Sequence, residues 1–275
     1  MIKKDILNKV YKKRKKDAHK HDFGMLLVIG GNNVFHGPPL YNSLAAYRSG
    51  VDLVFTVCPE RSADLVGSYG PDLITYPLDG KFIQTKHVKK LSKISKKADA
   101  IVLGGGLILA GLVNDKKTKK AIRKFLENTK KPCVLDAGAL KSINKDDIKE
   151  NFLLTPHSKE FEFLSNKKAN KKNAKEFAKE NNCTIILKGH TDIITNGKKT
   201  KENKTGTAFM TKGGTGDILA GIAGSLLAQG NDIFSSACAS TYIAGKAGEY
   251  ASKKYGQGLL ASDFIQEIPK VIKND

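Results

Sequence analysis

Lys212-Gly213-Gly214-Thr215-Gly216-Asp217 leads directly into the apolar stretch ILAGIAGSLLA of residues 218–228. The stretch is rich in alanine, glycine and leucine, so a helix formed there can be buried on several sides. Glycines before a helix free the backbone to aim N–H groups at one anion, and the helix dipole adds positive potential at that point. The segment therefore predicts a phosphate site that is held rigidly by a buried helix.

Upstream of this segment, short apolar runs alternate with stretches of helical length from Phe23 onward. The expected strands are Met25–Ile29, Leu53–Val57, Ala100–Leu103, Cys133–Leu135, Phe152–Leu154, Thr184–Leu187 and Asp192–Thr195. The expected helices are Leu40–Ser49, Lys116–Asn128, Asn173–Asn181, Ile218–Ala228 and Ile233–Ala251. Strands that alternate with helices are joined by crossovers, so the pattern predicts an α/β fold with a mostly parallel sheet covered on both faces.

The chain divides into a basic start and one long body. Residues 1–22 are charged with scattered apolar positions, and we expect a basic N-terminal arm or short amphipathic helix there. Residues 23–275 are expected to form a single domain, because no internal repeat or long Pro/Gly/Ser linker divides them. The sequence has no uncharged apolar run of membrane-spanning length and no apolar block after the basic start, so a cytoplasmic protein is expected.

Charge and cysteine usage narrow the function classes. The formal net charge is +20, from 47 Lys and Arg against 27 Asp and Glu, which raises a polyanion-binding protein as one alternative. The basic residues are mostly dispersed lysines without an aromatic or zinc-finger pattern, so no specific nucleic acid partner is expected. Cys58, Cys133, Cys183 and Cys238 lie far apart, which favours buried reduced thiols over a disulfide framework or a zinc site.

Asp217 is the candidate catalytic residue. A carboxylate beside an anion site binds phosphate poorly, but it is well placed to accept a proton from a hydroxyl that attacks the phosphate. The structural alternative makes Thr215 the N-cap of a helix with an acidic first turn. The G-x-x-x-x-G-K-[ST] loop is absent, and Gly104-Gly105-Gly106 lacks the later glycine of G-x-G-x-x-G, so that stretch is either a plain tight turn or a close approach to a ligand.

Two other strand ends carry candidate site residues. Thr155-Pro156-His157-Ser158-Lys159-Glu160 follows one apolar run, and Lys188-Gly189-His190-Thr191-Asp192 follows another. Glu160 is interpreted either as a first-turn helix residue favoured by the dipole or as a carboxylate that orients a hydrated Mg²⁺. Lys188 either reaches a nucleotide phosphate as a point charge or lies in a solvated turn.

Taken together and in this order, the motifs resemble the ADP- or ATP-dependent NAD(P)H-hydrate dehydratases of the ribokinase-like superfamily over residues 20–270. The matching segments are Gly30-Gly31, Gly37-Pro38-Pro39, Ala45 to Gly50, Gly104-Gly105-Gly106, Thr155-Pro156-His157 through Glu160, Lys188-Gly189 and Gly214-Thr215-Gly216-Asp217.

The resemblance implies a three-layer α/β/α ribokinase-like fold and an enzyme that repairs the (6S) hydrates of NADH and NADPH. ADP or ATP would be cleaved to AMP or ADP and phosphate, with Mg²⁺ as cofactor. By position, the hydrated nicotinamide nucleotide would contact Pro38, Gly106, His157 and Asp217. The nucleotide would be held by Lys188, Gly189, His190, Thr191, Asp192, Gly213, Gly214, Thr215 and Gly216, and Mg²⁺ by Glu160 through water.

Some positions depart from the family. Pro38 stands where the family often has Ala, Ile108 replaces the last glycine of its G-P-G-L-G turn, and Asp52 stands where many bacterial members have Gly. An epimerase domain is often fused ahead of this one, so we expect the chain to act on one epimer and to rely on another protein for the other. The same-fold alternative is a kinase of a thiazole or pyrimidine alcohol. A homo-oligomer that packs through the small residues of 237–247 stays open.

Overall fold

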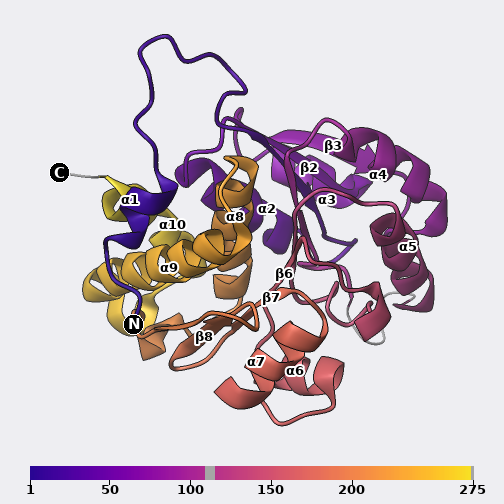
Figure 1. The fold of residues 1–275 in the computed structure, drawn as a ribbon. Coiled ribbons are helices and arrows are strands. Elements are labelled where there is room, and N and C mark those ends of the chain that lie inside the picture. Colours follow the sequence, from indigo (N-terminus) through magenta and orange to yellow (C-terminus); the bar gives the residue numbers. More distant parts are fainter. Residues whose placement is uncertain (109–114, 274–275) are drawn as a thin grey trace.

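The computed structural model describes residues 1–108 and 115–273, and its centre is a nine-stranded sheet (Figure 1). The strands are β1 (Met25–Ile29), β2 (Leu53–Pro59), β3 (Ile74–Leu78), β4 (Ala100–Leu103), β5 (Cys133–Leu135), β6 (Phe152–Leu154), β7 (Thr184–Leu187), β8 (Asp192–Thr195) and β9 (Thr200–Asn203). Their order is β3-β2-β1-β4-β5-β6-β7-β8-β9. The pairs from β3 to β7 are parallel, whereas β8 and β9 are joined to that edge in antiparallel pairs. The predicted mostly parallel sheet is confirmed.

Helices cover both faces of the sheet, as Figure 1 shows. One face carries α1 (Ile6–Val10), α2 (Gly37–Arg48), α8 (Thr215–Ala228), α9 (Ile233–Tyr255) and α10 (Ala261–Ile272). The other carries α4 (Val88–Ser95), α5 (Asp115–Glu127), α6 (Ser158–Ser165) and α7 (Lys171–Glu180). A further helix, α3 (Glu60–Gly67), packs on β2 and β3. The expected three layers are therefore present.

Each central strand supplies both cores, because successive side chains point to opposite faces of a sheet. In β1, Leu26 and Val28 belong to the core under α8 and α9, whereas Leu27 and Ile29 belong to the core on the opposite face. Such strands are buried on both sides and are read in sequence as continuous apolar runs rather than as alternating patterns. This burial explains why the central strands are visible in the sequence.

The long helix α9 packs inside the chain rather than presenting its small residues to a partner. Its alanines at 237, 239, 244 and 247 are buried in the same core as α8 and α10. None of the described helices combines the length and the apolar character that a bilayer crossing requires. All four cysteines are free and buried, as the sequence predicted.

Within the N-terminal stretch only Ile6–Val10 is helical, so a short helix is followed by a non-helical arm. The segment beyond α1 is tied to the body by Asp52. One carboxylate oxygen accepts from Arg14 Nη1 at 3.1 Å, and the other accepts from the backbone N–H groups of His21 and Phe23 at 3.1 and 3.0 Å. The Arg14 guanidinium also lies 3.7 Å from the Phe23 ring centroid. Asp52, one of the departures from the family pattern, therefore anchors the N-terminal arm.

Candidate functional site

The candidate site lies at the carboxyl edge of the parallel sheet, where ligands bind in open α/β sheets. Gly104 follows β4, Asp136 follows β5, Thr155 follows β6 and Lys188 follows β7. The amino end of α8 brings Asp217 to the same edge, because Asp217 and Lys188 are close enough to interact electrostatically. The topology therefore gathers the predicted motifs in one place.

The glycine turn before α8 ends in a left-handed residue. Gly214 has φ 97° and is the N-cap of α8, and a Cβ there would stand 2.5 Å from Tyr41 Cε2. Thr215 lies inside the helix and donates its hydroxyl to the Lys212 carbonyl at 3.1 Å, so the interpretation of Thr215 as N-cap is wrong. With no side-chain cap, the first-turn N–H groups of α8 keep their capacity to bind an anion.

Asp217 is a carboxyl with raised proton affinity. Burial, reinforced by the nearby carboxylate of Asp136, raises the pKa of Asp217 to about 7, against the opposing effect of Lys188. The residue is only partly buried, so a substrate can still reach it. A carboxyl that titrates near neutral pH suits a general base, since proton transfer is most efficient when the pKa matches the working pH. The placement and the pKa both suit the predicted role.

Lys188 is held by Asp136, a buried acid that was not predicted as a site residue. Its Nζ donates to Asp136 Oδ1 at 2.8 Å, and the same oxygen accepts from the Thr155 hydroxyl at 2.7 Å. Burial acts to lower the pKa of Lys188, but Asp136 and Glu160 outweigh it and raise that pKa. Lys188 therefore stays charged, and its Nζ would lie 3.2 Å from a Cβ on Gly216, in the first turn of α8.

His157 and Glu160 form a reciprocal cap at the start of α6. Glu160 Oε2 accepts from the His157 backbone N–H at 3.0 Å, and His157 Nδ1 accepts from the Glu160 backbone N–H at 3.3 Å. The other oxygen, Oε1, lies 3.5 Å from His157 Nε2. Glu160 thus performs the capping role, and its buried side chain also borders the cavity described next.

A cavity of about 850 Å³ opens beside these groups. Its polar wall contains His157, Glu160, Lys188, Gly189, His190, Asp192, Thr215 and Gly216. Its other wall was not predicted and is formed by Lys204 to Ala208, Met210 and Thr211 with Leu219, Thr241, Ala244 and Gly245. Size and lining fit a nucleotide, because charged groups that could hold phosphates are combined with small and apolar side chains.

Asp192 accepts hydrogen bonds from two segments that border this cavity. Its Oδ1 accepts from the Gly189 N–H at 3.1 Å and its Oδ2 from Asn203 Nδ2 at 3.1 Å. Burial raises the pKa of Asp192, although both hydrogen bonds oppose that rise. Asp192 therefore fixes the β7–β8 turn that carries Gly189. Thr191, Gly213 and Gly214 are not among the residues that line the cavity.

The predicted substrate residues Pro38, Gly106 and Asp217 lie together around Gly105, and none of them lines the cavity. A Cβ on Gly105 would stand 2.7 Å from Pro38 Cβ and closer still to Asp217 Oδ1. Gly106 is left-handed at φ 72° and packs on Gly31 and Phe35. His157, predicted as a substrate contact, borders the nucleotide-sized cavity. Asp217 is thus beside Gly105, while Gly216, the residue before it, lines the cavity.

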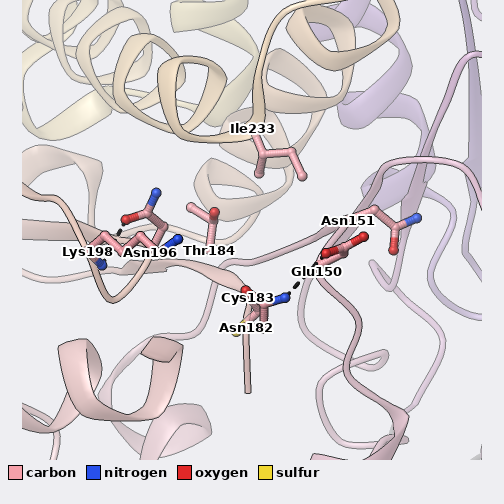
Figure 2. A pocket seen from close by; sticks show the side chains of 8 residues that line it. All are labelled: Glu150, Asn151, Asn182, Cys183, Thr184, Asn196, Lys198 and Ile233. Atoms are coloured by element: carbon pink, nitrogen blue, oxygen red, sulfur yellow. Dashed lines mark hydrogen bonds between the residues drawn. The ribbon is translucent and has the colours of Figure 1, made fainter. Parts of the chain in front are cut away.

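A second cavity, of about 400 Å³, lies at the opposite edge of the sheet (Figure 2). Asn151 immediately precedes β6 there, and Thr184 begins β7. Burial raises the pKa of the neighbouring Cys183 to about 12, so this thiol is not a ready nucleophile. None of the predicted site residues lines this cavity.

Comparison with known proteins identifies the family. The family model described as NAD(P)H-hydrate dehydratase matches residues 26–270. The chain is 40% identical over 267 residues to a bifunctional NAD(P)H-hydrate repair enzyme of Methanocaldococcus jannaschii, covering 96% of this chain and 51% of that one. It is 36% identical over 281 residues to an ADP-dependent (S)-NAD(P)H-hydrate dehydratase of Cenarchaeum symbiosum, covering 99% and 96%. The chain thus spans about half the length of the bifunctional archaeal relatives that it matches.

Solved structures agree on the fold. A ribokinase-like superfamily protein from Enterococcus faecalis matches with a TM-score of 0.87 at 24% identity, covering 98% of this chain and 94% of that one. The ADP/ATP-dependent NAD(P)H-hydrate dehydratase of Bacillus subtilis, co-crystallised with ATP and Mg²⁺, matches with a TM-score of 0.82 at 25% identity, covering 98% and 96%. The predicted ribokinase-like fold is confirmed, and the chain belongs to the NAD(P)H-hydrate dehydratase family.

Proposed function

We propose that the chain is an ADP- or ATP-dependent (6S)-NAD(P)H-hydrate dehydratase that restores NADH and NADPH. One observation carries the proposal above the others. Asp217, with its pKa raised to about 7, lies beside Gly105 at the uncapped start of α8, one residue after Gly216, which lines a nucleotide-sized cavity. The name of the Cenarchaeum symbiosum relative supports both the S epimer and ADP as donor.

The chemistry begins with transfer of a phosphoryl group, because hydroxide is a poor leaving group. The hydroxyl oxygen of the hydrate attacks the terminal phosphorus of the nucleotide, and Asp217 takes the hydroxyl proton. The bond between that phosphorus and the nucleotide's bridging oxygen breaks, which leaves AMP from ADP or ADP from ATP. The first-turn N–H groups of α8 and Lys188 stabilise the negative charge of the group in transfer.

The second step expels phosphate. The carbon–oxygen bond of the phosphorylated hydrate breaks with its electron pair on phosphate, a proton leaves the neighbouring ring carbon, and the ring double bond re-forms. The sum is loss of water from the hydrate coupled to nucleotide hydrolysis. A small-molecule kinase would stop after the first step, and membership of this family favours the dehydratase over that alternative.

Mg²⁺ fits this site through the nucleotide phosphates and water rather than through a protein cage. Across residues 1–108 and 115–273, no group of three or more His, Cys, Asp or Glu side chains is arranged to hold a metal ion. Glu160 uses Oε2 for its cap and keeps Oε1 beside the cavity, so one carboxylate oxygen is left to orient coordinated water. When bound, Mg²⁺ would neutralise charge that develops on the phosphates.

We also propose His190 and Asp192 on the β7–β8 turn, with Gly189, as nucleotide contacts, and Pro38 and Gly106 as contacts of the hydrate. The four free buried cysteines support a reducing, cytoplasmic setting.

The test is direct. Purified protein, Mg²⁺ and ADP or ATP are added to a hydrate preparation, and recovery of the reduced-nicotinamide absorbance is followed together with phosphate release. We expect both signals to appear at equal rates, and running ADP and ATP in parallel identifies the donor. Transfer of phosphate onto the substrate without recovery of absorbance would instead establish a kinase.

A further inference from the structure

Asn42 carries a buried oxygen that has no partner. The residue lies in the middle of α2 and is 2% exposed, and its Oδ1 makes no hydrogen bond in the described structure. Buried polar atoms almost always have a hydrogen-bond partner. An unpaired acceptor next to a reaction site therefore suggests a donor that is present only in some states of the reaction.

The orientation of the Asn42 amide is fixed by its other end. Its second terminal atom lies 2.6 Å from the backbone carbonyl oxygen of Asp217. A carbonyl oxygen only accepts hydrogen bonds, so that atom must be the donating Nδ2, and Oδ1 is the atom left unpaired. Flipping the amide would set two oxygens against each other.

The unpaired oxygen lies near the catalytic carboxyl. The point where a Cβ on Gly105 would stand lies 3.4 Å from Asn42 Oδ1 and closer still to Asp217 Oδ1, so both oxygens converge beside Gly105. Close packing of α2 on α8 enforces this, since a Cβ on Gly221 would stand 2.9 Å from Asn42 Cα. Asn42 Oδ1 is buried from solvent. The nearby Asp217 carboxyl can become a donor once it has gained a proton.

We propose that Asn42 is a positioning residue for the proton-accepting step: its Oδ1 receives the hydrogen bond of the Asp217 carboxyl once that carboxyl has taken the substrate's proton. The inference rests on the proposed function and adds to it a residue that acts through Asp217. While Asp217 is ionised, the Asn42 amide oxygen opposes its charge, and after protonation the same oxygen accepts its hydrogen bond. Both effects make Asp217 a stronger base.

Other charges also act on Asp217 and must be held constant in any test. Asp136 after β5 and Glu160 on α6 favour its protonated form, whereas Lys188 after β7 favours the ionised form. Variants at position 42 keep these three charged side chains, so they change only the effect of the residue on α2 on the pKa of Asp217.

The experiment compares two substitutions that push the proton affinity in opposite directions. Asn42→Leu removes the acceptor, so we expect the acid limb of the kcat/KM profile to move to lower pH by about half to one unit, the size of one hydrogen bond to one protonation state. Asn42→Asp adds a second carboxyl, so the limb moves to higher pH. Ser43→Ala is the matched control, since it removes a buried hydroxyl from the next residue of α2 that bonds Pro39 and Thr56 instead of the site. We expect no shift from it.

A second readout does not depend on turnover. Carbon-13 NMR of the full chain can follow the titration of the Asp217 carboxyl, whose signal is assigned by its disappearance in Asp217→Asn. The pKa of this carboxyl should shift in opposite directions in Asn42→Leu and Asn42→Asp. If wild-type protein fails to dehydrate the hydrate while these shifts appear, the proposed function is wrong and the role of Asn42 stands. If wild-type protein is active and the Asp217 titration is unchanged in Asn42→Leu, or both variants shift in one direction, the inference is overturned. Should Asn42→Leu not fold, Asn42→Ala removes the same acceptor without added bulk.

Discussion

Replacing Asp217 by asparagine should abolish activity and yet stabilise the fold at neutral and higher pH. The substitution keeps the shape of the side chain but removes the proton acceptor and the partly buried charge. Loss of a general base costs about 10²–10⁴-fold in rate. The new amide can also donate permanently to the unpaired Asn42 Oδ1, a bond that the ionised carboxylate cannot make.

The size of the stabilisation follows from the pKa of Asp217. Burial first, and Asp136 second, raise that pKa from 3.8 to about 7. Each pKa unit corresponds to about 1.4 kcal/mol, which sets a ceiling of about 4 kcal/mol. Because the side chain is only partly buried, we expect about 1–3 kcal/mol.

The sign gives the prediction a distinctive pH dependence. Between about pH 4 and about pH 7 the folded protein keeps a proton on Asp217 that the unfolded chain has lost, so wild-type stability falls as the pH rises through this window. An asparagine has no proton to lose. The advantage of Asp217→Asn should therefore be small near about pH 4, grow up to about pH 7 and stay constant above it.

Urea unfolding of both proteins across this pH range measures the effect, with the slope of the transition checking that both unfold in the same way. A variant that is no more stable than wild type at about pH 8, or whose advantage does not change with pH, would show that the carboxyl is not destabilised in the folded state. The pKa argument for Asp217 as base would then fail.

Three further substitutions test other parts of the site. Gly105→Ala places a methyl group 2.7 Å from Pro38 Cβ and against Asp217, so kcat should fall by more than about tenfold with nucleotide affinity unchanged. Gly70→Ala is the control and should keep full activity, because no atom lies within 4 Å of the new Cβ. Equal activity of the two variants would contradict the crowding at Gly105. Lys188→Met should weaken ADP binding by about 10–100-fold in calorimetry, the loss of one charge-assisted hydrogen bond, and undiminished affinity would remove Lys188 from the phosphate site. Glu160→Gln keeps a capping oxygen but loses charge, so half-maximal activity should need more Mg²⁺, whereas an unchanged requirement would leave Glu160 as a helix cap alone.

The central strands could be predicted because burial on both faces makes them apolar throughout. The two missed strands are at the sheet edges, where that rule weakens. β3 contains Pro77 and is largely half-exposed, and β9 consists of the polar residues Thr200–Asn203. Edge strands pair on one side only, so they tolerate proline and polar residues that a central strand excludes. Sequence pattern alone therefore predicts the middle of this sheet better than its borders.

The site was predictable wherever its residues directly follow an apolar run. The same rule would have found Asp136, which comes immediately after Cys133–Leu135. The cavity wall from Lys204 to Thr211 has no such signal, because its position depends on contacts with α9. Met210 occupies the space left by the missing side chain of Gly248, and Gly206 donates its backbone N–H to Glu249 Oε1 at 3.0 Å. This wall is formed by packing between segments that are distant in sequence, so no local sequence pattern predicts it.

Asn42 shows a different limit of sequence reasoning. It occupies an ordinary helical position, and its residue type is unremarkable there. Its role depends on the fold, because Gly221 lets α2 approach α8 and the unpaired oxygen comes to lie near the Asp217 carboxyl. A functional role that consists of an unsatisfied atom is visible in the folded structure and nowhere in the local sequence.

Asp136 and Asp217, two of the acids near Lys188, differ in how directly they interact with its ammonium group. The ammonium donates directly to Asp136, which also accepts from Thr155, so that carboxylate has the partners that compensate its burial. Asp217 receives the longer-range influence of Lys188 and one backbone hydrogen bond, but burial and the charge of Asp136 still raise its pKa. A nucleotide phosphate that binds near Lys188 adds negative charge to the same region, which favours the protonated form of Asp217 further. We therefore expect the base to be stronger in the nucleotide complex, where it is needed, than in the free protein.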